Sequence, residues 1–157
     1  MMETKVETPE IFNIPEIELV YITGSDKSPK HIISGSDKAY NAVMEKWDEG
    51  KIELVIQCKV LLVNNAKKSL GIYTLSSGGR SIAGVDVRMI FAAALTHAAT
   101  GIILCTNHPA GLLRPSAEEE KLVAKIKEGG NLLDISLLDF LIVSKEGYFS
   151  FKDEGVL

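Results

Sequence analysis

The chain has 157 residues, 46% of them hydrophobic and 24% charged, which suits one globular domain with a sizeable core. Its net charge of −4 argues against a basic field that would recruit nucleic acid, and no apolar run reaches the length of a membrane-spanning helix. Cys58 and Cys105 stand in apolar runs and are expected to be buried free thiols. Because the first residues lack the apolar core of a signal peptide, we expect a cytoplasmic protein.

The N-terminal part of the chain combines an arm, a strand pattern and a helix pattern. Residues 1–15 are mostly polar with two prolines, and they predict an extended N-terminal arm. Residues 16–22 begin with strict alternation and predict a strand that opens a single domain. Residues 37–49 predict a helix, with Ser36 as its N-cap and Gly50 just past its end.

The rest of the chain alternates between strand and helix patterns. Further strands are expected at residues 52–63, 70–75, 102–105, 137–143 and 148–151, and further helices at residues 86–99 and from Ser116 to Gly129-Gly130. The first of these strands is apolar on both faces, which is typical of a central strand covered on both sides. The order of elements predicts an α/β protein whose mixed sheet has helices on both faces.

The most informative stretch is residues 101–120, where an apolar strand leads through a polar loop into a helix. Ser116 and Glu119 have the spacing of a capping box, in which each side chain bonds the other residue's backbone N–H. His108 lies in the loop, next to a helix start that favours negative charge. A loop between a strand and a helix N-terminus is where α/β proteins often place ligands and chemistry.

This stretch resembles the RadC family of bacterial JAB/MPN (JAMM) domains. The family motif is His-x-His, seven residues, then Ser-x-x-Asp, and RadC-like chains usually read His-Asn-His-Pro-Ser-Gly followed by Pro-Ser. Here the chain reads Thr106-Asn-His-Pro-Ala-Gly111, and seven residues separate His108 from Ser116-Ala-Glu-Glu119. The resemblance is strongest over residues 51–157. It implies one three-layer α/β/α domain, residues 16–157, of the kind shared with cytidine deaminases.

The resemblance also implies a metal site and a catalytic apparatus. In the family, two His and one Asp hold zinc, a Glu acts as general base and the motif Ser stabilises the oxyanion. The family's metal positions correspond here to Thr106, His108 and Glu119, so the first His is replaced and the Asp is lengthened. Ser116 keeps the oxyanion position, and Ile56 stands where the family has its catalytic Glu. We therefore expect zinc binding to be weak or absent.

Each of these residues also has a structural interpretation. His108 is also explained as a loop histidine that bonds the backbone, which we favour over a metal ligand, and Glu119 is fully explained as the capping-box partner of Ser116. The nearest carboxylate upstream of Ile56 is Glu53, three residues away, which a regular strand would point to the opposite face. Only a β-bulge would turn it back toward the site.

Three functions compete on these grounds. The first is a catalytically impaired JAMM metallohydrolase that acts as a binding module for a protein or peptide. The alternative is a zinc-dependent metallopeptidase or isopeptidase with an altered ligand set. The third is the DNA repair role that the family label implies, but the chain is acidic and shows no helix-hairpin-helix pattern before Lys51. We rank the first highest, with a homodimer as one possible assembly.

Overall fold

The structure is a computed structural model that describes residues 4, 14–22, 30–79 and 82–157. Most of the expected arm at residues 1–15 lies outside the described residues. The elements in chain order are α1 (Ser36–Met44), β1 (Gln57–Val63), β2 (Ser69–Ser77), the short 3-10 helix η1 (Ile82–Gly84), α2 (Val87–Thr96), β3 (Gly101–Asn107), α3 (Ala117–Leu133), β4 (Ser136–Val143) and β5 (Tyr148–Ser150). No helix in this described part combines the length and apolar character that crossing a bilayer requires.

The strands form one mixed sheet in the order β2-β1-β3-β4-β5. β1 is antiparallel to both β2 and β3, β3 is parallel to β4, and β5 returns antiparallel to β4. The parallel step from β3 to β4 needs a crossover, which α3 supplies. β3 is therefore an interior strand, as its apolar run predicted, and every residue in it is buried.

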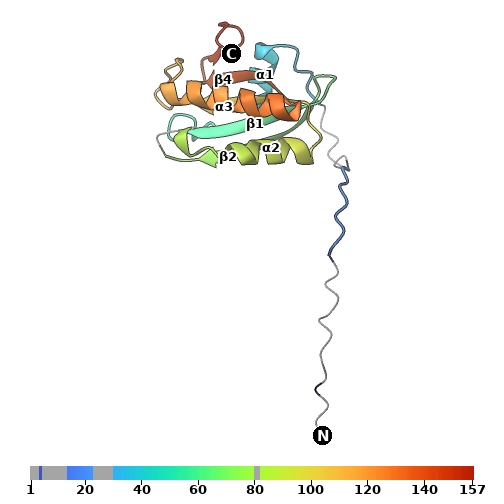
Figure 1. The fold of residues 1–157 in the computed structure, drawn as a ribbon. Helices are drawn as coiled ribbons and strands as arrows, with labels where there is room; N and C mark the ends of the chain where they lie inside the picture. Colours follow the sequence, from blue (N-terminus) through green and yellow to red (C-terminus); the bar gives the residue numbers. More distant parts are fainter. Residues whose placement is uncertain (1–3, 5–13, 23–29, 80–81) are drawn as a thin grey trace.

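Helices cover both faces of the sheet and make two cores (Figure 1). On β3, Ile102 and Leu104 face the core that contains residues of α2 and α3. The residues between and after them, Ile103 and Cys105, face the core built with α1. This alternation is the period of a strand buried on both sides. The expected three-layer α/β/α architecture is confirmed.

The strand expected at residues 16–22 does not form. These residues have no regular secondary structure and are exposed to solvent. Alternation marks a segment that is able to form a strand, but a strand also needs a neighbour to satisfy its backbone groups. In the described residues, the five-stranded sheet contains no partner for this segment.

The first helix is shorter than the pattern predicted, and its cap differs. Its N-cap is Gly35, with no side-chain cap, and Ser36 instead bonds the hydroxyl of Tyr148 at 2.9 Å and the carboxylate of Asp153. The helix ends at Met44 rather than near residue 49, and the chain turns so that Trp47 is buried. The predicted Ser36 cap and Gly50 end are therefore wrong, because tertiary contacts outweigh the local signals.

The long strand expected at residues 52–63 begins only at Gln57. Residues 51–55 form a helical turn, in which Val55 N donates to the carbonyl of Lys51 at 3.0 Å. The side chain of Asn107 holds this turn from the end of β3 by donating to the carbonyls of Ile52 and Val55. Because Asn107 is far from this turn in the sequence, the contact cannot be inferred from the alternation of apolar and polar residues at 52–56.

The expected end of α3 at Gly129-Gly130 is also wrong, since the helix continues to Leu133. Asp134, in a left-handed conformation with φ of 56°, forms its C-cap. At Gly130 an added Cβ would lie 2.2 Å from the carbonyl oxygen of Ile135, and at Gly129 it would lie 2.9 Å from the Phe91 ring. The glycine pair therefore allows α3 to pack closely against its neighbours, and it does not end the helix.

Candidate functional site

The candidate site lies where β3 ends and the chain passes through a loop into α3. Thr106 and Asn107, the last residues of β3, are fully buried. Thr106 lies opposite Cys58 of β1 and Ile142 of β4 in the sheet register. It shares the strand face of Leu104, which packs in the α2–α3 core, so its side chain is directed to that side of the sheet.

Ser116 and Glu119 form the capping box that their spacing predicted. The Ser116 hydroxyl oxygen accepts from Glu119 N at 3.2 Å, and Glu119 Oε2 accepts from Ser116 N at 3.0 Å. This confirms the structural interpretation of both residues. Glu119 is only 2% exposed, which is unusual for a carboxylate and requires that its charge be satisfied internally.

His108 supplies the second partner of that buried carboxylate. Its Nε2 lies 2.5 Å from Glu119 Oε1, and its Nδ1 lies 2.6 Å from the carbonyl oxygen of Leu112. Because a carbonyl only accepts, the Nδ1 atom must carry a proton. The hydrogen bond with Glu119 raises the pKa of His108, against the opposing effect of burial. The arrangement is that of an imidazolium paired with a carboxylate.

Two other positions that the resemblance points to, Ile56 and Thr106, supply neither a carboxylate nor an imidazole. Ile56 precedes β1 and is half-buried, and its carbonyl accepts from Gly78 N at 2.9 Å. Its hydrocarbon side chain has no group that takes a proton. The Thr106 hydroxyl is buried and donates to the Asn107 carbonyl at a long 3.5 Å. The structure thus joins His108, Glu119 and Ser116 in one hydrogen-bonded group, and within the described residues Ile56 and Thr106 stand outside it.

Asn107 and Cys58 complete the surroundings of the site, and sequence reasoning assigned neither a role there. Asn107 Oδ1 accepts from Gln57 N at 2.8 Å, so the side chain ties the start of β1 to the end of β3. The sequence feature that points to Asn107 is its place in the Asn-His-Pro triplet of the family motif. Burial, together with the charge of Glu119, raises the pKa of Cys58 to about 12, so the thiol stays protonated.

These residues do not fit the three-ligand zinc site that the resemblance implies. The Nδ1–H bond of His108 to a backbone carbonyl is common in metal-ligating histidines, but its Nε2, the nitrogen left to bind a metal, is taken up by Glu119. Both oxygens of Glu119 are already bonded by the protein, and a protonated Cys58 is no thiolate ligand. In the part of the chain that the structure describes, no group of three or more His, Cys, Asp or Glu side chains is placed to hold a metal ion.

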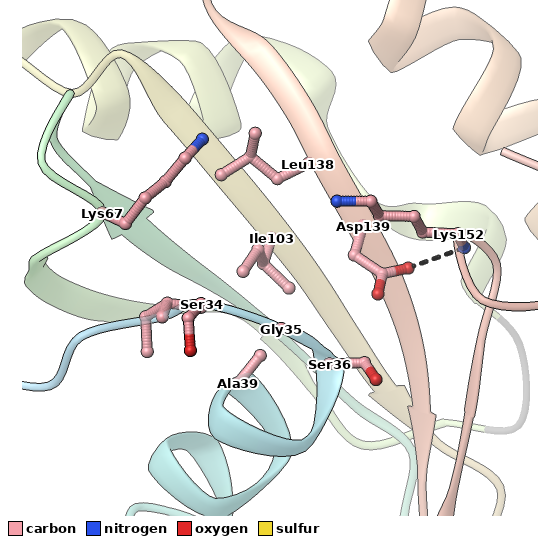
Figure 2. A pocket seen from close by; sticks show the side chains of 10 residues that line it. Ser34, Gly35, Ser36, Ala39, Lys67, Ile103, Leu138, Asp139 and Lys152 are labelled. Carbon is pink, nitrogen blue, oxygen red and sulfur yellow. Dashed lines mark hydrogen bonds between the residues drawn. The ribbon is translucent and has the colours of Figure 1, made fainter.

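A small cavity of about 90 Å³ lies on the α1 side of the sheet, apart from the residues above (Figure 2). Asp139 lines it, and burial raises the pKa of its carboxyl group. The carboxyl group is fully used, since it bonds Ser150 Oγ at 2.5 Å, Phe140 N at 2.7 Å and Lys152 N at 3.1 Å. Asp139 therefore fastens β4 to the segment after β5 and is a structural residue.

Comparisons with known proteins agree with the geometry of the fold. The model of the family described as "RadC-like JAB domain" matches residues 33–156. A "UPF0758 protein" of Flavobacterium johnsoniae is 45% identical over 97 residues, 62% of this chain and 42% of that protein. Another, of Clostridium kluyveri, is 32% identical over 153 residues, 98% of this chain and 65% of that protein. The chain spans about half the length of the curated relatives it matches, with shares from 42% to 48% among the first several.

Proposed function

The chain belongs to the RadC-like JAB domain family, and from this premise we propose that it has lost zinc-dependent hydrolysis and acts by binding a protein or peptide. The observation that carries the proposal is the His108–Glu119 pair. Two side chains that would have to face a metal ion instead satisfy each other's charge. The result is an ion pair that closes the loop onto the start of α3.

The remaining functional positions support the same proposal. Catalytic zinc normally has three protein ligands and an open position for water. Here a neutral hydroxyl, Thr106, stands in place of the first imidazole and has little affinity for zinc. Ile56 in place of the general base leaves nothing to take the proton from a bound water. Ser116 remains and its oxygen accepts in the helix cap, but a hydroxyl alone, with no metal and no base, does not activate a water.

The loop that the ion pair holds is the surface we expect a partner to contact. The carbonyl of Leu112 is fixed by His108, while the Leu112 side chain is 58% exposed. Arg114 is exposed on the same loop. An ordered loop that presents an apolar and a cationic side chain suits a protein or peptide partner. Direct contact with DNA forms no part of the proposal, because the chain has a net charge of −4.

The alternative is a zinc-dependent metallopeptidase or isopeptidase in which His108 and Glu119 are ligands. One observation favours it, namely that the two side chains converge from a loop and a helix eleven residues apart. It requires that zinc displace a proton from His108 and break the ion pair. It also requires a third ligand and a base from outside the positions that the family uses.

Calorimetric titration with zinc separates the two proposals. We expect the parent chain to bind zinc weakly or not at all near neutral pH. The double variant Thr106→His, Glu119→Asp should bind it with a 1:1 endpoint, because alternate strand-end side chains share a face and converge on one ion. Adding His108→Ala to the double variant should abolish that binding. Tight stoichiometric binding by the parent would support the hydrolase, and no gain in a folded double variant would refute the correspondence with the family motif.

A further inference from the structure

The segment before the domain exposes a series of large aliphatic side chains. The exposed fractions are 83% for Ile17, 93% for Leu19, 71% for Val20 and 83% for Ile22. Figure 1 shows residues 14–22 running away from the domain rather than back over it. Several large apolar side chains exposed on one short segment are uncommon on a monomer and indicate a surface that another molecule covers.

The segment also has the pattern of a strand that lacks a neighbour. Residues 16–22 read Glu-Ile-Glu-Leu-Val-Tyr-Ile, rich in β-branched and aromatic residues. The Tyr21 ring lies edge-on against the ring of His97, with 6.2 Å between centroids, at the C-terminal end of α2. Upstream of that contact the segment projects away from its own domain, so its apolar side chains are positioned to meet another molecule.

A strand edge that could receive the segment exists on the same protein. β2 is an outer strand of the sheet and pairs with β1 on one side only. Residues 31–33 cover the start of the outer edge of β2. Ser69 N donates to the His31 carbonyl, and Ile33 N donates to the Lys67 carbonyl. Beyond this point, the described residues provide no second strand for the outer edge from Gly71 to Ser77.

The composition of this edge favours strand addition. Proteins commonly protect an edge strand with lysine, proline or an inward charge, and residues 69–77 contain none of these. Two bulges displace Leu70 and Leu75, but the four residues between them pair regularly with β1. Exposed Lys67 and Lys68 flank the edge, and the incoming segment carries Glu16 and Glu18, so the charges of the two surfaces are opposite.

We propose that residues 16–22 of one copy of the chain add as a strand to the outer edge of β2 in a second copy. The second copy returns its own segment to the first, so the exchange closes under two-fold symmetry and covers both open edges. Backbone hydrogen bonds supply the pairing, and the alternating aliphatic side chains supply the buried surface. This inference concerns a different surface from the loop of the proposed function and does not depend on it.

The first test is the molar mass in solution, measured by light scattering over a range of concentrations. The full chain is expected to be a dimer that dissociates on dilution. Leu19→Glu should shift it to a monomer that keeps the parent's far-UV circular dichroism spectrum, because Leu19 is 93% exposed in the single chain. The matched control, Leu132→Glu, alters a residue of α3 that is 84% exposed and should leave the dimer intact. A parent that is monomeric at all concentrations would overturn the proposal.

The second test identifies the pairing with a short thiol-reactive cross-linker. Leu19 and Tyr73 are the central residues of the segment and of β2, so they lie near each other whichever way the strand runs. The native Cys58 and Cys105 are buried and leave the background low. The variant Leu19→Cys, Tyr73→Cys should give a covalent dimer, while Leu132→Cys, Tyr73→Cys should not. A link within one chain would show that the segment folds onto its own sheet, and no link would show that it does not pair with β2; either result refutes the proposal.

Discussion

His108 is the residue on which the charge of the site depends. Its two ring nitrogens meet a carbonyl and a buried carboxylate, and both contacts favour the protonated ring. The contact with Glu119, which would have to break for a metal to bind, also ties the loop to the start of α3. Neutralising His108 would therefore weaken both the ion pair of the site and the stability of the fold.

The pH dependence of stability should reveal this pair. A histidine whose pKa is raised in the folded state contributes stability that is complete below its unfolded value, about 6.5, and is lost as pH rises through the folded pKa. We expect His108→Gln to cost most at mildly acidic pH and progressively less at alkaline pH, in urea unfolding. In a Glu119→Gln background the pH-dependent part of that cost should disappear. A cost that is constant or grows with pH would contradict the pairing.

Ser116 should matter to folding whatever its chemical role. We expect Ser116→Ala to lower the free energy of unfolding by about 1 kcal/mol, because the α3 cap loses its acceptor for Glu119 N. Ser116→Thr keeps a capping oxygen and serves as the matched control, with a smaller loss. Equal denaturation midpoints for the parent and Ser116→Ala would remove the capping assignment.

At the scale of elements, Asn107 joins three segments through one buried side chain. Asn107→Ala would leave Gln57 N and two carbonyls of the turn before β1 without their partner. We expect a loss of about 2–4 kcal/mol, since each buried group that loses its partner has a substantial desolvation cost. Hydrogen exchange of the Gln57 amide should also accelerate. Asn64→Ala, in an exposed turn, should cost less, and an equal or larger cost there would contradict this account.

The glycines of α3 test the close packing of that helix on the start of β4. Replacing an exposed helix glycine by alanine usually stabilises by up to about 1 kcal/mol. Gly130→Ala should instead destabilise by about 2 kcal/mol or more, because the new Cβ would meet the backbone oxygen of Ile135 at 2.2 Å. Gly129→Ala meets a side-chain ring, which is able to shift, and should cost less. Thermal unfolding of both variants gives the order, and stabilisation by Gly130→Ala would refute the clash.

These elements also show what the sequence predicts and what it does not. The interior strand at Ile102–Cys105 and the capping box at Ser116 are local patterns, in an apolar run and a three-residue spacing, and both are confirmed. The predicted start of β1 and the predicted end of α3 are wrong. The observed start depends on the contacts of Asn107, and the observed end depends on the close approach of Ile135 to the helix. Such contacts arise only once the chain has folded.

At the scale of the whole molecule, the resemblance predicts the layers better than it predicts the site. The family match and the observed sheet agree on a three-layer α/β/α domain. His108 and Glu119 were expected as two ligands of one ion, and the structure brings them together as partners of each other. The motif spacing positions the two residues, but the hydrogen bond with Glu119 that raises the pKa of His108 against the effect of burial forms only in the folded loop, which spacing does not encode.

The central claim is that this ion pair replaces the metal of the family site. The most direct measurement is the metal content of the full chain, purified without a metal-chelating tag and analysed by elemental mass spectrometry. The account predicts zinc far below one atom per chain, and no gain after incubation with zinc followed by gel filtration near neutral pH. One zinc per chain that is lost on His108→Ala would contradict the account and favour the hydrolase.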